Sequence, residues 1–221
     1  MKTIDGLPLP EAILRAAIPT FVEHGYDKAS MDDVAARAST TKRTVYAHFG
    51  SKEALFRHAL AKAVELFHSE MPRLEDPARP AAELEKFLVG FSDLSTWRGA
   101  VRLQRVVMGE AERFVELGAM LHERIILHAE SRLADYLALA DRARGAAEQG
   151  PAAYLALASL LLNMATGPQR FATLLHARAS LPMHPLAQAP QDLDRAAIRR
   201  AIAIFLCGTG MAAPVDTGDE T

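Results

Sequence analysis

Three short helical patterns follow one another near the start of the chain, and their close spacing limits its possible folds more than any other feature. Apolar side chains recur at three- and four-residue steps over residues 14–22, as on one face of a helix. Ser30 and Thr41 are suited to cap the next two helices, which only a tight turn at Ser39-Thr40 separates. Two short helices joined in this way predict a helix-turn-helix unit.

Glycine and proline residues mark the limits of the first helix. Residues 1–10 contain one glycine and two prolines, which favours a flexible arm, and the helix is expected to begin at Pro10 or Glu11. Pro19 removes a backbone hydrogen bond inside the helix, at a cost of about 3 kcal/mol if nothing compensates, so we expect a kink there. Gly25 is suited to end the helix in a left-handed conformation.

The third short helix has one apolar side and one polar side. Val45 and Phe49 are expected to face the core. Lys42 and Arg43 bring positive charge to the helix start, and the planar fork of Arg43 can pair with guanine in the major groove of DNA. Further hydrogen-bonding side chains are Thr41, Thr44, Tyr46 and His48. We interpret residues 40–49 as a DNA recognition helix, and the alternative is that these charges merely solvate a small helical domain.

The same region carries the pattern of a known family. The matching motifs are Ile13-Leu14-x-Ala16-Ala17, Phe21-x-x-x-Gly25-Tyr26, Ser30-Met31-x-x-Val34-Ala35-x-x-Ala38, Thr44-Val45-Tyr46-x-His48-Phe49 and Ser51-Lys52-Glu53-Ala54-Leu55-Phe56. Residues 13–60 thereby resemble the N-terminal domain of the TetR family of transcriptional regulators. The chain departs from that pattern at Ser39, where a glycine is usual, at Arg43, where a small residue is common, and at Pro19.

The resemblance implies a set of contacts with double-stranded DNA. It implies that Tyr46 and Lys52 contact backbone phosphates. The residues that it implies for the groove are Thr41, Lys42, Arg43, Thr44 and His48. Ser30, at the start of the preceding helix, is a further candidate for a phosphate contact.

The charge of the chain is compatible with a local DNA-binding patch. The net charge is −2, so the chain as a whole is not a polycation. Residues 11–62 contain eight Lys and Arg residues against six Asp and Glu residues, a balance of +2. This difference does not establish DNA binding by itself, and the clustering of Lys42, Arg43 and Lys52 carries more weight.

Several features favour a cytoplasmic location. The single cysteine, Cys207, cannot form an internal disulfide, which suits a reducing compartment. The first eleven residues hold one lysine and no long apolar run, so no signal peptide is expected. No stretch reaches the roughly 18 apolar residues of a membrane helix, and no membrane partner is expected.

The rest of the chain also favours helices. Helical patterns cover residues 82–95, 101–108, 112–140, 151–166 and 192–207. The pattern of 151–166 continues to residue 175, past a possible break at Gly167-Pro168. The predicted fold is all-α, with an N-terminal three-helix DNA-binding domain and a C-terminal helical bundle for ligand binding and dimerisation. The predicted divisions are a flexible arm (1–10), the helix-turn-helix domain (11–62), the effector-binding and dimerisation domain (63–211) and a disordered tail (212–221).

The resemblance implies that the last two helices of each subunit form a four-helix dimer interface. Residues 154–164 are apolar all round, and Ala197, Ala201, Ile204 and Phe205 give the last helix a seam for close packing. A homodimer suits a palindromic operator with half-sites about one helical turn apart. Charge at Ala201 or Ile204 is then expected to produce monomers. The alternative is that both helices pack inside one subunit.

A ligand pocket is expected among the middle helices, because large and adaptable apolar side chains suit a small apolar effector. The candidate lining residues are Phe67, Phe87, Phe91, Trp97, Val101, Met108, Met120, Ile125 and Met164. Each of them also suits an ordinary core position. Polar candidates that could orient a ligand are Arg102, Arg105, Glu110, His122, Glu123 and His128.

The resemblance implies a ligand-responsive repressor that leaves its operator when the effector binds. The C-terminal region of about 150 residues is larger than dimerisation alone requires. The alternatives are a DNA-binding regulator without an effector, and an activator. An enzyme is disfavoured. His122 and His128 are six residues apart and face different sides of a helix, which argues against a metal site. The sequence also contains no His-Glu-x-x-His, Cys-x-x-Cys, P-loop or Gly-x-Ser-x-Gly motif. No cofactor is expected.

Overall fold

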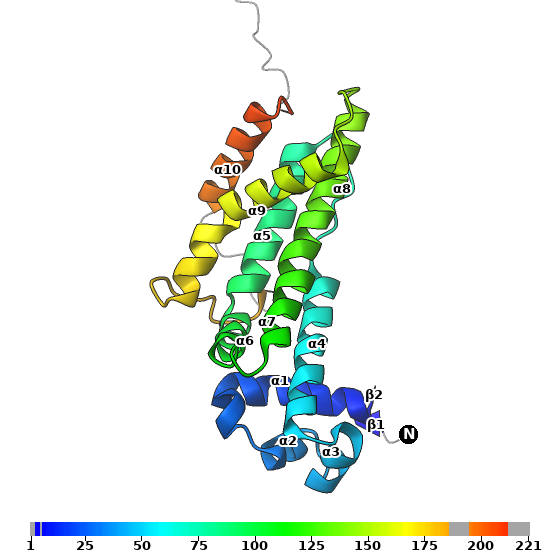
Figure 1. Cartoon of the computed structure of the whole chain (residues 1–221), viewed down its shortest axis with the longest axis vertical. Coiled ribbons are helices and arrows are strands. Elements are labelled where there is room, and N and C mark those ends of the chain that lie inside the picture. Colours follow the sequence, from blue (N-terminus) through cyan, green and yellow to red (C-terminus); the bar gives the residue numbers. More distant parts are fainter. Residues whose placement is uncertain (1–2, 5, 186–194, 212–221) are drawn as a thin grey trace, which may run out of the picture.

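The structure is almost entirely helical, and the predicted all-α fold is confirmed. The computed structural model describes residues 3–4, 6–185 and 195–211. The elements are β1 (Thr3–Ile4), β2 (Leu7–Pro8), α1 (Leu9–Lys28), α2 (Met31–Arg37), α3 (Lys42–Phe49), α4 (Lys52–Glu70), α5 (Pro80–Thr96), α6 (Arg98–Gly109), α7 (Val115–Leu121), the π-helix η1 (His122–Leu127), α8 (His128–Ala143), α9 (Pro151–Leu174) and α10 (Arg195–Gly208). Figure 1 shows α1–α3 at one end of an elongated molecule, from which α4 runs into the bundle of later helices. Among the described residues, none of the helices combines the length and apolar character needed to cross a bilayer.

The first residues differ from the flexible arm that the sequence favours. Thr3–Ile4 pairs antiparallel with Leu7–Pro8, and Gly6 between them adopts a φ of 79°. Glycine tolerates this conformation because it has no Cβ. The short hairpin leads directly into α1, which begins at Leu9 rather than at Pro10 or Glu11.

The path of α1 also differs from the prediction. Gly25, with φ 73° and ψ 177°, is the residue of α1 whose dihedral angles are not helical, and the helix continues to Lys28. Pro19 lies within regular helix, so the expected kink at this residue is wrong. The backbone bends at Gly25 because a residue without a Cβ takes up a positive φ at little cost.

The predicted helix caps at Ser30 and Thr41 are confirmed, and Ser51 caps α4 in the same way. The hydroxyl oxygens of Ser30, Thr41 and Ser51 each accept a hydrogen bond from the backbone N–H three residues later, at 3.0, 3.2 and 3.0 Å. Between α2 and α3, Ser39 adopts a φ of 49°. This left-handed conformation favours glycine, which explains why glycine is usual at this position of the family pattern.

The core around the helix-turn-helix extends beyond residue 62. Phe114, in the turn before α7, is buried, and its ring centroid lies 4.9 Å from that of Tyr26 and 6.0 Å from that of Phe56. Arg57 of α4 pairs with Glu116 of α7 at 2.6 Å. Residues on both sides of the predicted domain boundary therefore pack together.

Several helix limits in the C-terminal half differ from the predicted ranges. The helix expected over residues 112–140 begins at Val115 and contains the π-helical turn η1 before it continues to Ala143. The helix expected over 101–108 begins earlier, at Arg98, and α9 is unbroken through Gly167-Pro168. Residues 192–194 and the predicted disordered tail lie outside the described residues.

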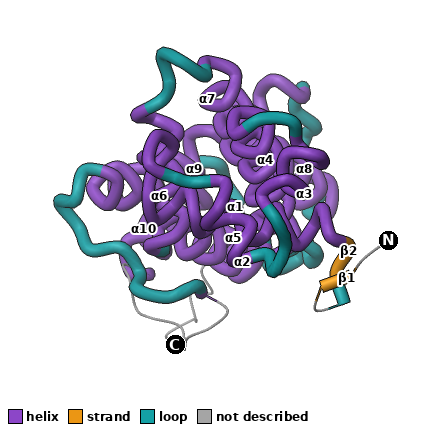
Figure 2. The backbone as a smooth tube through the Cα atoms, turned by 90° about the horizontal axis from the view of Figure 1, so that it is seen from below, coloured by secondary structure: helices purple, strands orange, loops and turns teal. Residues whose placement is uncertain are grey.

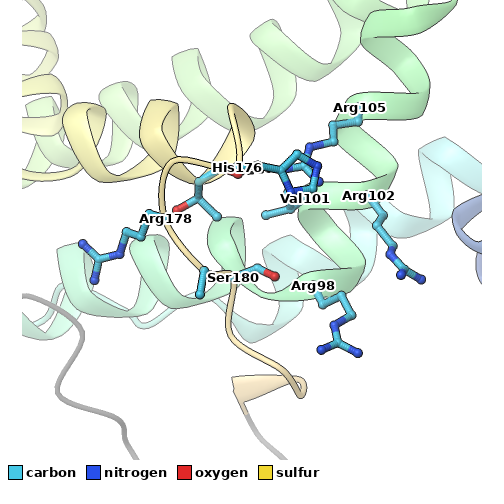
Figure 3. A pocket seen from close by; sticks show the side chains of 9 residues that line it. Arg98, Val101, Arg102, Arg105, His176, Arg178 and Ser180 are labelled. Carbon is cyan, nitrogen blue, oxygen red and sulfur yellow. Dashed lines mark hydrogen bonds between the residues drawn. The ribbon is translucent and has the colours of Figure 1, made fainter.

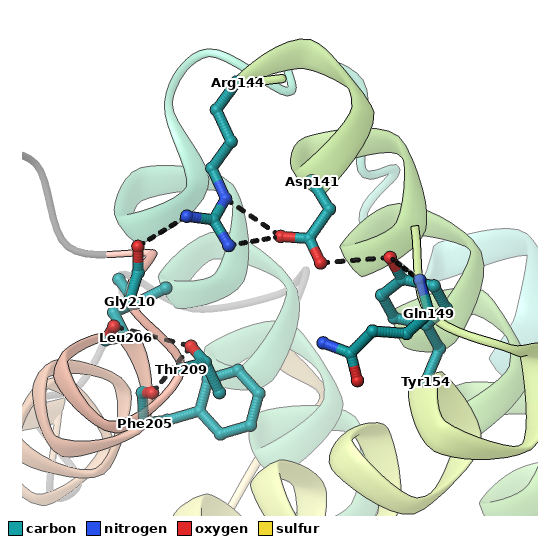
Figure 4. A network of polar contacts seen from close by, with 8 residues as sticks. All are labelled: Asp141, Arg144, Gln149, Tyr154, Phe205, Leu206, Thr209 and Gly210. Carbon is teal, nitrogen blue, oxygen red and sulfur yellow. Dashed lines mark hydrogen bonds and ion pairs between the residues drawn. The ribbon is translucent and has the colours of Figure 1, made fainter. Parts of the chain in front are cut away.

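A buried carboxylate joins three helix ends at the far end of the bundle (Figure 4). Asp141, near the end of α8, is 1% exposed. One of its oxygens accepts two hydrogen bonds from Arg144, at 2.9 and 2.7 Å, and the other accepts one from the Tyr154 hydroxyl of α9 at 3.0 Å. Arg144 also donates to the Gly210 carbonyl after α10, at 2.6 Å. Both oxygens of the Asp141 carboxylate therefore have hydrogen-bond donors.

We expect Asp141→Ala to lower the free energy of unfolding by about 2 kcal/mol, because it leaves a buried hydroxyl and a partly buried guanidinium without an acceptor. Because Arg144 is partly exposed, the expected loss of stability is smaller than the cost of breaking a fully buried pair. Denaturant unfolding measures the change. Asp135→Ala, on the exposed side of the same helix, is the matched control, and an equal effect of the two substitutions would contradict the assigned role of the network.

Candidate DNA-binding surface and effector cavity

The outer face of α3 presents most of the predicted DNA contacts. Val45 is fully buried, as predicted, and anchors the helix on the core. The side chains of this helix face that are exposed are Thr41, Lys42, Arg43, Tyr46 and His48. Ser30, Thr44 and Lys52 are half-buried. The elements that carry these eight residues, namely α2, α3 and the start of α4, lie together at one end of the molecule (Figure 1).

The three cations of this surface differ in their surroundings. Lys42 pairs with Asp32 at 2.8 Å, and this hydrogen bond raises the pKa of the lysine. Lys52 donates to the Asp27 carbonyl at 2.8 Å and lies 4.9 Å from the centre of the Tyr26 ring, so it also ties α4 to the end of α1. Arg43 forms no hydrogen bond or ion pair within the described part of the chain, which leaves its guanidinium available.

The hydroxyl groups near α3 are already engaged in capping. Thr41 Oγ1 accepts the capping hydrogen bond and lies 2.8 Å from Thr44 Oγ1. Ser30 Oγ accepts a similar bond at the start of α2. A hydroxyl that accepts one hydrogen bond still has its own proton to donate. The Ser30 proton is therefore free to bind phosphate, whereas one of the two threonine protons is used in the bond between Thr41 and Thr44.

A cavity of about 860 Å³ lies between α1, α4, α6, η1 and α9, and we call it the inner cavity. Seen from below in Figure 2, α1 crosses the base of the molecule, and it packs against both α4 and α6. Apolar side chains that line the inner cavity include Ile18, Leu60, Phe67, Leu103 and Ile125. Its volume and apolar walls are those of a site for a small organic molecule.

The predicted pocket residues fall into several groups. Those that line the inner cavity are Phe67, Trp97, Met108 and Ile125. Phe87 and Phe91 are fully buried in the core between α5, α8 and α9, and Met164 packs against that core. Met120 packs against the N-terminal core instead. The helical register explains this division, because it turns Phe87 and Phe91 toward α8 and α9.

A second hollow, of about 560 Å³, lies beside the inner cavity and is lined mainly by basic residues (Figure 3). Arg98, Arg102 and Arg105 project from successive turns of α6, and Val101, a predicted pocket residue, lies among them. Arg105 donates to two backbone carbonyls at the end of α9, at 2.7 and 2.9 Å. Arg98 and Arg102 line both hollows.

The π-helical turn η1 contacts the helix that leads to the DNA-binding end. His68 of α4 forms a hydrogen bond with the Arg124 carbonyl of η1, and its ring lies against that of His128 with centroids 4.3 Å apart and a tilt of 35° between the planes. His122 lines the inner cavity instead. The two histidines of the disfavoured metal site thus have different surroundings, and no metal-binding cluster occurs among the residues that the structure describes.

Two family models match the chain, one for each end. Residues 13–59 match the bacterial regulatory proteins of the tetR family. Residues 82–208, more than half of the chain, match the C-terminal domain of AefR-like transcriptional repressors. The chain belongs to the TetR family. It is therefore a DNA-binding transcriptional regulator of a non-enzymatic class, as the sequence predicts.

Curated relatives of this TetR-family protein match at its DNA-binding end. An HTH-type transcriptional repressor of Mycobacterium tuberculosis is 40% identical over 65 residues, which are 28% of this chain and 35% of the relative. The HTH-type transcriptional activator FasR of Mycolicibacterium smegmatis is 42% identical over 53 residues, 24% of each chain. The chain thus spans about a third or less of the length of these relatives.

Solved structures of the family match over nearly the whole chain. A TetR-family transcriptional regulator from Mesorhizobium loti has a TM-score of 0.71 at 20% identity, over 90% of this chain and 96% of that one. A protein described as the flavonoid-responsive regulator FrrA has a TM-score of 0.69 at 25% identity, with the same coverage. The overall arrangement of helices is therefore that of the family.

Sequence reasoning did not find several residues of the inner cavity in this TetR-family protein. Ile18 and Val22 of α1 line it, and the sequence places both only on the apolar face of the first helix. Ile13 and Phe21 of the same helix are fully buried in the N-terminal core. The apolar side chains of α1 therefore contribute both to this core and to the cavity wall. Arg170 also lines the inner cavity, and the apolar pattern of α9 gave no sign of it.

Proposed function

We propose that this TetR-family protein is a repressor that binds a palindromic operator as a homodimer and is released by a small effector with a large apolar part. The effector binds in the inner cavity. The DNA contacts come from Ser30, Thr41, Lys42, Arg43, Thr44, Tyr46, His48 and Lys52. Arg43 reads a base because its guanidinium has no partner among the described residues of the free protein, whereas Lys52 binds phosphate.

The position of the inner cavity is the observation that carries this proposal. Its walls include Ile18 and Val22 of α1 and Leu60 and Phe67 of α4, and the start of α4 directly follows the recognition helix. A molecule between these helices and α6 has to alter their spacing or rigidity if it is to affect DNA binding. A ligand shifts the equilibrium between a DNA-binding and a released conformation only by its difference in affinity for the two. The contact of the effector with α1 and α4 supplies that difference.

An exposed apolar surface on α9 and α10 supports the homodimer. Leu160 of α9 is 59% exposed and Ile204 of α10 is 65% exposed. The two helices pack against each other, and large exposed apolar groups are candidates for interaction sites. Ala201 and Phe205 of the predicted seam are buried inside the subunit, so charge at Ala201 would disrupt the subunit itself and does not test the interface.

Selection of bound sequences from random DNA, followed by binding titrations with and without compounds that raise the melting temperature, tests the proposal. A palindromic consensus is expected, together with compounds that both stabilise the protein and release the DNA. Stabilising compounds that leave DNA binding unchanged would contradict effector control. A transcription assay on the selected operator separates repression from activation, which matters because the named relatives include both classes.

A further inference from the structure

One cation on the wall of the inner cavity has no counter-charge among the described residues. Arg170 lies in the C-terminal half of α9, and its Nε atom is buried without a hydrogen-bond partner. Its Cζ atom lies 5.1 Å from the centre of the Phe91 ring, and burial lowers the pKa of the guanidinium. No carboxylate in the described part of the chain forms an ion pair with it. Because an unpaired buried cation is costly, this arrangement is best explained by an anion that occupies the cavity.

The other charged groups of the cavity wall do not supply that anion. Glu23 and Glu70, the two acidic residues of the wall, already form ion pairs with other basic side chains. Arg98 and Arg102, which also line the cavity, belong to α6, whose sequence contains no acidic residue. The wall therefore carries an excess of positive charge beside a largely apolar surface.

We propose that the effector is an amphipathic organic anion, with its apolar body against Phe67 and Ile125 and its oxyanion head group bound by Arg170. This inference rests on the proposed effector function of the inner cavity. A planar guanidinium donates two parallel hydrogen bonds to a carboxylate, sulfonate or phosphate. Arg98 and Arg102 attract the anion to the cavity from the neighbouring hollow. A neutral effector would leave Arg170 unpaired.

Two fluorescent probes with the same apolar body show how much of the binding affinity comes from the anionic head group and how much from the apolar cavity. 8-Anilinonaphthalene-1-sulfonate carries a sulfonate, and N-phenyl-1-naphthylamine has the same rings without it. Both are titrated into the full chain. The wild-type protein is expected to bind the sulfonate at least about tenfold more tightly, because a hydrogen bond to a charged group contributes about one to two orders of magnitude in affinity.

Variants of Arg170 assign the preference to this residue. Arg170→Gln removes the charge at similar length, and we expect it to lower the affinity for the sulfonate about tenfold or more while the neutral probe binds unchanged. Arg170→Lys keeps the charge and is expected to retain part of the preference. Arg79→Gln, which alters an exposed arginine just before α5, should change neither affinity. Thermal melting shows whether each variant is folded.

The outcomes distinguish failure of the anion assignment from failure of the proposed effector cavity. Equal wild-type affinity for both probes, or an equal loss of both in Arg170→Gln, overturns the anion assignment and leaves the effector cavity in place. A lower melting temperature with an unchanged ratio of affinities also overturns it, because Arg170 would then only pack on Phe91. If neither probe binds, the proposed effector function fails together with the anion assignment.

Discussion

Replacing Arg43 with alanine is expected to lower the affinity for the selected operator by about 1–3 kcal/mol per half-site and to remove the preference at one base pair. Arg43 is exposed on the outer face of α3 and has no partner in the described part of the chain. Its fork can form two hydrogen bonds with guanine, which a wrong base cannot accept in the same geometry. Binding titrations against operators substituted at each position measure the change.

Tyr46→Phe is the control for the Arg43 prediction. It removes one hydroxyl that is expected to contact phosphate, so it should weaken binding to all sequences to a similar extent. Lys52→Ala is less suitable, because it also breaks the contact of Lys52 with the Asp27 carbonyl. If Arg43→Ala keeps the full sequence preference, then Arg43 is not the base-reading residue.

Local signals in the sequence were sufficient to predict the helices of the helix-turn-helix and their caps. Ser30, Thr41 and Ser51 act on backbone groups three residues away, so their capping roles depend only on neighbouring residues. Val45 follows from the helical period in the same way. These interactions do not depend on the rest of the fold, which explains why the prediction succeeds here.

Tertiary contacts caused most of the differences from the predictions. Phe114 packs on Tyr26, nearly ninety positions earlier in the chain, and no local pattern indicates this pairing. Phe87 and Phe91 are large aromatic residues one helical turn apart, as residues that line a cavity often are. The packing of α5 directs both into the core instead. Arg170 stands in a mainly apolar helix, and only the buried Nε atom identifies it as a residue without a partner.

A dimer through α9 and α10 predicts that Leu160→Glu and Ile204→Glu each produce monomers and lower operator affinity at least about 100-fold. Burial of either charge in an apolar interface is costly, and a monomer loses the high effective concentration of the second half-site reader. Light scattering after size exclusion measures the mass, and binding titrations measure the affinity. Leu139→Glu, at a comparably exposed leucine of α8, should remain dimeric with unchanged affinity. Dimers of both interface variants would show that the subunits meet elsewhere, and monomers with full affinity would show that one reader is sufficient.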